Sequence, residues 1–298
     1  MPSPYYSRRF CLNFERIKSF PQYLIPQHAV SLLMGNLADR PLGKITTSII
    51  NWFAKKYHVN MQEAIHEDTA YFSTFNAFFT REIKPETRPL AQEYAIIQPA
   101  DGIVSQLGKI ESDQMIQAKG HFFSCMDIVG GQQNLAAKFN DGHFANIYLS
   151  PKDYHRVHMP IRGKLLEMHH IPGKLFSVNP FTARTVPNLF ARNERVLCLF
   201  ETELGLMAQI LVGATIVGSI ETVWHGTVTP PSSSEISSFY YEGDNAITLE
   251  QGQEMGRFKL GSTVILMFEP NKVSFLAQLQ SESAVKMGEG LGQAQKRQ

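Results

Sequence analysis

The sequence predicts an α+β protein with a mainly antiparallel β core, barrel-like or sandwich-like, preceded by a helical region. Two observations support this. Apolar side chains in the first sixty residues recur at helical spacing, whereas from about residue 96 short runs rich in Val, Ile and Phe alternate with Gly and Pro. The 298 residues suffice for one large domain with an appendage. We therefore expect a helical region, 1–65, and a β-rich domain, 66–298.

Helical spacing is clearest after Pro26, which can occupy the first turn of a helix. Val30, Leu33, Met34 and Leu37 follow at i, i+3, i+4 and i+7. These side chains predict a helix with one apolar face.

A second helical segment places Ile45, Ile49, Trp52 and Phe53 on one face, and it ends in two lysines. Residues 1–60 carry a net charge of +6, although the whole chain carries only +1. Apolar stripes with basic ends suit helices that lie at a membrane interface. Packing on the protein's own core explains the stripes equally well, so both interpretations stay open.

The rest of the chain predicts a connector, then strands. Residues 61–90 resemble a helical connector that runs into a proline-marked loop. The expected strands are Ile96–Ile97, Gly102–Leu107, Ala145–Leu149, Arg195–Phe200, Leu206–Val212 and Thr263–Phe268, with a hairpin around 201–205. The tail after Val285 is polar and Gly-rich, so we expect it to fray.

Several classes of protein are disfavoured by composition. The near-neutral charge gives no sign of nucleic-acid binding. The three cysteines, Cys11, Cys125 and Cys198, are odd in number and far apart, which favours a reducing compartment over a disulfide framework. The longest apolar stretch, Ala208–Ile220, is shorter than the roughly 20 residues of a membrane span, and it predicts a buried strand pair. The N-terminus lacks the apolar core of a signal peptide.

Four residues could carry chemistry, although each has a commoner explanation. His155 and His158 could act as acid and base near neutral pH, or could satisfy hydrogen bonds in a loop. A metal site is disfavoured because no third ligand follows at a regular spacing. Asp101 precedes Gly102 in a turn signal, and Ser262 precedes an apolar run, so both also fit ordinary turns.

Taken together, seven segments resemble phosphatidylserine decarboxylases of the bacterial type. In chain order they are FNAFFTREIKPETRP, PADG, YLSPKDYHRVHMP, LFSVN, FARNERV, VGATIVGSI and GQEMGRFKLGSTV. They cover most of the chain from about residue 70 onward, and the combination of LGST with RFK and DYHRVHMP is highly specific. Residues 1–60 are similar more loosely.

The resemblance implies a self-processing enzyme. The chain would be cut between Gly261 and Ser262 into a β chain, 1–261, and an α chain, 262–298, and Ser262 would become a covalent pyruvoyl group. That group would form a Schiff base with phosphatidylserine and release CO₂ and phosphatidylethanolamine. His158 resembles the base for cleavage, and Asp101 its partner carboxylate, which would fix the imidazole tautomer.

The remaining roles are also implied by the resemblance. His155 resembles the histidine that protonates the carbon left by decarboxylation. Ser177 and Asn179, in LFSVN, are candidates for binding the substrate, and no metal is implied. The enzyme would be a peripheral protein on the cytoplasmic face of the cell membrane, where phosphatidylserine lies, and a homodimer is left open.

Two other functions remain open. A pyruvoyl decarboxylase of a soluble amino acid would share the chemistry but would not need a basic amphipathic N-terminus. A non-enzymatic binding module is the second alternative, because the family's core is similar to lipoyl-type barrels and a fold alone does not define an activity.

Overall fold

The structure is a computed structural model that describes residue 19 and residues 21–118, 120–215, 219–229, 234–259 and 262–295. Cys11, Gly261 and the basic residues of the first eighteen positions lie outside the described residues.

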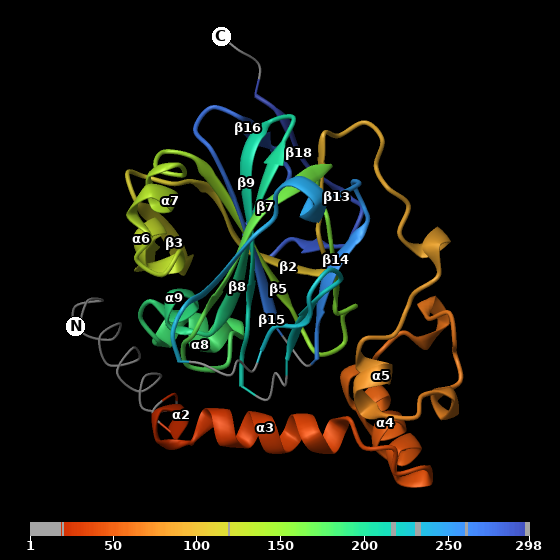
Figure 1. Cartoon of the computed structure of the whole chain (residues 1–298). Coiled ribbons are helices and arrows are strands. Elements are labelled where there is room, and N and C mark those ends of the chain that lie inside the picture. The colour runs from red at the N-terminus through yellow and green to blue at the C-terminus, as the bar shows by residue number, and fades with distance from the viewer. Residues whose placement is uncertain are drawn as a thin grey trace, which may run out of the picture.

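The helices form an N-terminal layer and short segments beside the β core (Figure 1). The α-helices are α2 (Pro21–Leu24), α3 (Gln27–Ala38), α4 (Lys44–Tyr57), α5 (Phe75–Phe79), α6 (Cys125–Ile128), α7 (Gln133–Ala137), α8 (Pro180–Thr185) and α9 (Leu189–Arg192). The 3₁₀ turns are η1 (Met61–Glu63), η2 (Thr69–Tyr71), η3 (Pro85–Thr87) and η4 (Gly243–Asn245). The connector over 61–90 is therefore mostly turns, and the prediction of a helical connector was largely wrong.

A nine-stranded antiparallel sheet forms the centre of the β domain, in the order β12-β7-β8-β9-β15-β5-β2-β17, with β13 also paired to β7. Its strands are β2 (Gly102–Lys109), β5 (His143–Leu149), β7 (Gly163–Ile171), β8 (Arg195–Thr202), β9 (Gly205–Val212), β12 (Ser237–Tyr240), β13 (Ile247–Leu249), β15 (Ser262–Phe268) and β17 (Ala284–Val285).

Three smaller sheets complete the domain, in the orders β11-β10-β14-β6, β1-β18-β16 and β3-β4. Their strands are β1 (Ile96–Ile97), β3 (Gln114–Ala118), β4 (His121–Ser124), β6 (Arg156–His158), β10 (Ile220–Thr222), β11 (Gly226–Thr227), β14 (Glu254–Phe258), β16 (Val273–Phe275) and β18 (Gly290–Ala294).

The central sheet is covered on both faces, which explains why every residue of β15 is buried. Side chains alternate along the strand. Val264 and Leu266 belong to a core shared with the small sheets, whereas Ile265 and Met267 belong to a second core beneath α6, α7 and α9. The sheets are open, and the described residues form no closed barrel.

The predicted strands and hairpin are confirmed to within a few residues. In the hairpin, Thr202 of β8 pairs with Gly205 of β9. The stretch Ala208–Ile220 divides between β9 and β10, which belong to different sheets, and residues 216–218 lie outside the described residues. The C-terminal tail was expected to fray, but this was wrong, because β18 pairs with both β1 and β16.

The N-terminal helices turn their apolar faces outward. In α3 the buried residues are Gln27 and Ser31, whereas Leu33 is 61% exposed. In α4 the side chain of Trp52 is 58% exposed. The exposed apolar side chains of this layer are Tyr23, Leu24, Ile25, Leu32, Leu33, Met34, Leu37, Leu42, Ile45, Ile49 and Trp52. Across the described part of the chain, no helix is long and apolar enough to cross a membrane.

The inner side of α4 packs on residues that follow it in sequence. Ile50 and Phe53 contact Phe72, Phe78 and Phe79 in a separate aromatic cluster. This cluster attaches the N-terminal helices to the segment that leads into the β domain. The division at residue 65 stays a prediction.

Candidate active site

Ser262 begins strand β15, where it pairs with Leu149 at the end of β5. The residue is fully buried, and its hydroxyl has no hydrogen-bond partner among the residues that the structure describes. Because buried polar groups are nearly always hydrogen-bonded, an unpartnered buried hydroxyl at a strand end suggests a functional role. Gly261, on its N-terminal side, lies outside the described residues.

His155 lies just before β6 and is completely buried against Phe79, with 4.0 Å between the ring centroids. Its Nδ1 lies 2.8 Å from the carbonyl oxygen of Asp153, so Nδ1 carries the proton and donates it. Its Nε2 has no partner. Burial lowers the pKa of His155 to about 3. The imidazole is therefore neutral near pH 7 and offers a free lone pair at Nε2.

His158 ends β6 and pairs with Glu254 of β14. Its Nδ1 donates to the carbonyl oxygen of Gly252 at 2.8 Å, and its Nε2 accepts from the hydroxyl of Tyr154 at 3.1 Å. Burial lowers the pKa of His158, while it raises that of the Tyr154 phenol. At neutral pH His158 is thus a neutral base whose basic nitrogen is Nε2.

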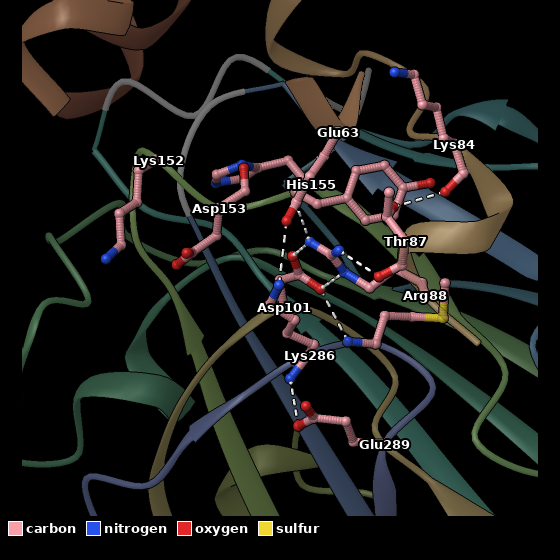
Figure 2. Close-up of polar contacts among 12 residues, drawn as sticks. Glu63, Lys84, Thr87, Arg88, Asp101, Lys152, Asp153, His155, Lys286 and Glu289 are labelled. Atoms are coloured by element: carbon pink, nitrogen blue, oxygen red, sulfur yellow. Dashed lines mark hydrogen bonds and ion pairs between the residues drawn. The ribbon is translucent and has the colours of Figure 1, made fainter. Parts of the chain in front are cut away.

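Asp101 is held on three sides. Arg88 donates from Nε to Oδ1 at 2.8 Å and from Nη2 to Oδ2 at 2.5 Å, and the backbone N–H of Met287 donates to Oδ1 at 2.9 Å. The same Arg88 donates to Glu63 at 2.6 Å, and Glu63 in turn pairs with Lys286 at 3.1 Å (Figure 2). These bonds fix the carboxylate between segments far apart in sequence.

Backbone geometry, not a side-chain bond, brings Asp101 near His158. The N–H of His158 donates to the carbonyl oxygen of Pro99 at 2.8 Å. The charge of Asp101 works to raise the pKa of His158, but no direct hydrogen bond joins them. In this structure the carbonyl of Gly252, and not the carboxylate of Asp101, is the partner of His158 Nδ1, and the role of Asp101 as partner carboxylate stays a prediction.

A cavity of about 240 Å³ opens beside Asp101 and Tyr154. Its lining includes Arg81, whose side chain is buried and whose Nε has no partner. Burial lowers the pKa of Arg81 to about 10, so the guanidinium stays charged. Lys152 and Asp153 also line the cavity, and Figure 2 shows them on the side of Asp101 away from Lys84.

The two candidate substrate-binding residues have structural roles here. Asn179 caps α8, accepting from the N–H of Thr182 at 2.8 Å. The N–H of Ser177 donates to Gln22 at 3.0 Å. Neither side chain has a hydrogen bond to the four residues above. Their role in binding substrate stays a prediction.

The described residues contain no group of three or more His, Cys, Asp or Glu side chains that could hold a metal. Cys125 and Cys198 are buried free thiols.

The residues that support the site were not predicted from the sequence. Arg81 and Arg88 lie in the segment FNAFFTREIKPETRPL, which was noted only for its resemblance. Two arginines in a segment whose first five residues include three phenylalanines could have suggested partners for a buried carboxylate. Tyr154 lies next to His155, but nothing in the sequence predicts its bond to His158.

An unpartnered buried serine hydroxyl, two neutral histidines and an anchored carboxylate define a protein equipped for nucleophilic and acid–base chemistry. The family model described as "Phosphatidylserine decarboxylase" matches residues 75–293, and one described as "PSD" matches residues 17–58. The chain belongs to the phosphatidylserine decarboxylase family and is a decarboxylase, a carboxy-lyase.

Curated relatives agree over nearly the whole chain. The phosphatidylserine decarboxylase proenzyme of Vibrio campbellii is 56% identical over 277 residues, which are 92% of this chain and 97% of that protein. The protein of the same name from Vibrio cholerae is 55% identical over 278 residues, 92% of this chain and 98% of its own. The protein of the same name from Acidovorax ebreus is 53% identical over 277 residues, which are 93% of this chain and 97% of that protein.

Proposed function

We propose that the chain is a proenzyme that cuts itself between Gly261 and Ser262 and then converts phosphatidylserine into phosphatidylethanolamine and CO₂. The observation that carries this proposal is the buried, unpartnered hydroxyl of Ser262 at the start of β15. The curated relatives are named as proenzymes, which supports a processing step.

The proposed cleavage follows from the chemistry of these residue types. The Oγ of Ser262 attacks the carbonyl carbon of Gly261 and gives its proton to a base, for which we propose Nε2 of His158. The peptide C–N bond breaks and an ester forms. Removal of the Ser262 α-proton then breaks the ester C–O bond, which releases Gly261 as a carboxylate. Addition of water and loss of ammonia leave a ketone at position 262.

The residues present fit such a ketone, because position 262 is enclosed and, within the described part of the chain, no group is hydrogen-bonded to its side chain. The pyruvoyl group would supply an electron sink for the charge left when CO₂ departs. His155 is suited to proton movement at Nε2, since its Nδ1–H is engaged by Asp153. With a pKa of about 3, His155 must first accept the proton that it later delivers.

The outward apolar faces of α2, α3 and α4 support a peripheral position on the membrane that contains the substrate. These side chains lie where a helix parallel to the bilayer would bury them, and residues 1–60 carry a net charge of +6. We place the enzyme on the cytoplasmic leaflet, because that leaflet is rich in anionic lipid.

The intact mass of purified variants tests the processing step. We expect the wild type to yield two chains that separate at residue 262, with the mass of a ketone in place of the serine amine. Ser262→Ala and His158→Ala should each remain a single chain, whereas His155→Ala should be cut but turn over poorly. His169→Ala removes another buried histidine and should still be cut, which controls for damage to the fold. A fully cut Ser262→Ala protein would overturn the proposal.

The substrate needs its own test. Deleting residues 1–60 should abolish binding to vesicles. If the truncated protein kept full activity on a soluble amino acid but none on short-chain phosphatidylserine, the soluble-substrate alternative would replace this proposal.

A further inference from the structure

A second cavity lies where the N-terminal helices meet the β domain. It has a volume of about 340 Å³, and its walls come from the start of α3, from Tyr23 in α2, and from Lys174, Phe176 and Arg192. None of Asp101, His155, His158 or Ser262 lines it. Figure 1 shows α2 next to α8 and α9, on the side of the molecule where α3 runs.

Three polar side chains fix the shape of the cavity, because they anchor the helices to one segment of the β domain. Gln22 accepts from the N–H of Ser177 at 3.0 Å, and Gln27 accepts from that of Leu175 at 2.7 Å. The Nε2 of His28 lies 2.8 Å from the carbonyl oxygen of Gly173. These bonds use the polar side of α2 and α3, which leaves their apolar side facing outward.

The charge of the cavity is entirely basic. Arg192 lies over the rings of Tyr23 and Phe176, with its Cζ 5.4 Å and 4.8 Å from the two centroids. The N–H of Lys174 donates to the carbonyl oxygen of Arg192 at 2.7 Å, so their backbones adjoin. Among the residues that the structure describes, no acidic side chain lines the cavity, and neither cation has an ion-pair partner.

The two aromatic rings make Arg192 a preorganised donor. Tyr23 and Phe176 meet edge to face at 4.9 Å, and Phe176 is buried. A guanidinium stacked on rings keeps its N–H groups in its own plane, where they match two oxygens of a phosphate. Here Nη1 also donates to the Tyr23 hydroxyl at 3.4 Å. A nearby ammonium adds a point charge to the same anion.

We propose that this cavity binds the phosphodiester of an anionic membrane phospholipid, at a site separate from the catalytic residues. A lipid fits better than a free phosphate because Leu24 and Ile25, 72% and 42% exposed, continue the cavity's edge into the apolar surface of α2 and α3. A headgroup in the cavity would place its acyl chains along that surface. The contacts require an anionic headgroup, so phosphatidylglycerol should serve as a probe, whereas the quaternary ammonium of phosphatidylcholine offsets its phosphate charge and would meet Lys174 and Arg192 unfavourably.

Vesicle partitioning of the full chain tests the site. Lys174→Met and Arg192→Met remove the charges but keep unbranched stems, and the second keeps contact with the rings. On vesicles of phosphatidylcholine with phosphatidylglycerol, each variant should bind about fivefold more weakly, and the double variant about 25-fold. On phosphatidylcholine alone, all should bind like the wild type, because the apolar helices are unchanged.

The control is Lys138→Met, which removes one exposed cation at the end of α7, away from the N-terminal helices. An equal loss in this control, or equal losses on both kinds of vesicle, would overturn the proposal. So would displacement from the vesicles by millimolar inorganic phosphate. If the Arg192 variant fails to fold, Lys174→Met alone still tests the proposal, because Lys174 is exposed and its replacement should leave the fold intact.

Turnover distinguishes this site from the catalytic one. With short-chain phosphatidylserine below its micelle concentration, the double variant should match the wild type. Lost turnover in the variant alone would mean that the cavity belongs to the substrate site, and the proposal of a separate site would fall. Absent turnover in the wild type would instead contradict the proposed function and leave the vesicle result standing.

Discussion

Replacing Arg88 with glutamine should destabilise the fold by about 3–5 kcal/mol, the usual cost of leaving one member of a buried ion pair alone. The side chain of Arg88 is 3% exposed, that of Asp101 is 9% exposed, and two hydrogen bonds join them. Without the guanidinium, Asp101 would keep only the N–H of Met287, and Glu63 would keep Lys286. The loss is a large part of the roughly 5–15 kcal/mol that stabilises a typical domain.

Urea unfolding is the assay, carried out on single-chain proteins that also carry Ser262→Ala so that cleavage does not complicate the equilibrium. Arg162→Gln is the matched control, because it breaks the ion pair with Glu250, whose side chains are 66% and 68% exposed. Such an exposed pair is worth about 0–1 kcal/mol. If the two substitutions cost the same, Arg88 does not hold Asp101 in solution, and the account of the site is wrong.

Three further predictions concern the buried groups and the C-terminal segment. Burial depresses the pKa of His155 to about 3, so below pH 6.5 the unfolded chain takes up a proton that the fold excludes. The free energy of unfolding, measured in urea, should therefore fall by up to about 1.4 kcal/mol for each pH unit below 6.5. The fall should be smaller in His155→Asn. Gly102→Ala should lower the thermal midpoint more than Gly108→Ala in the same strand, because a Cβ at 102 would lie 2.3 Å from the carbonyl oxygen of Tyr148, whereas one at 108 meets nothing within 4 Å. The α chain should co-elute with the β chain in native gel filtration and separate only in denaturant, since β15 lies between β9 and β5; an α chain lost under native conditions would contradict this.

The strands were predictable because their side chains report burial directly. The run Val264–Phe268 is apolar throughout, and β15 is buried on both faces. Its neighbours were not predictable, because β5 and β9 pair with it from positions far away in the sequence. The amphipathic helices were predictable for a related reason, but the pattern of α3 does not say which face is inside. Gln27 and Ser31 face inward, and Gln27 accepts a hydrogen bond there from the N–H of Leu175.

The C-terminal tail shows how a composition rule fails. The tail after Val285 is polar and glycine-rich, yet its segment Gly290–Ala294 forms β18, because backbone groups pair in a sheet whatever the side chains are. Glycine is required there, not merely tolerated. A Cβ at Gly290 would meet the ring of Tyr94 at 2.2 Å, and one at Gly292 would lie 2.7 Å from the carbonyl oxygen of Ser274. Close approach of this kind leaves no periodic signal in a sequence.

The resemblance predicts the residues of the candidate site, which stay predictions, but it does not predict their hydrogen bonds. Asp101, His155, His158 and Ser262 came from the resemblance, and the structure gives three of them contacts that spacing could not suggest. The carboxylate of Asp101 accepts from Arg88. The Nδ1–H of His158 donates to the carbonyl oxygen of Gly252, and the Nδ1–H of His155 donates to that of Asp153. Backbone carbonyls fix both imidazole tautomers, and any residue type would supply a carbonyl.

The position of the proposed cut explains how a chain could break itself without losing its fold. Residues 262–295 are held at several places by strands that precede the cut: β15 by β5 and β9, β17 by β2, and β18 by β1. A break before β15 removes one covalent link but none of these pairings. The same segment supplies the N–H of Met287 that holds Asp101, so the chain that would carry the reactive ketone also positions the carboxylate. Losing the α chain would therefore remove the reactive group and also release Asp101 from one of its three hydrogen bonds.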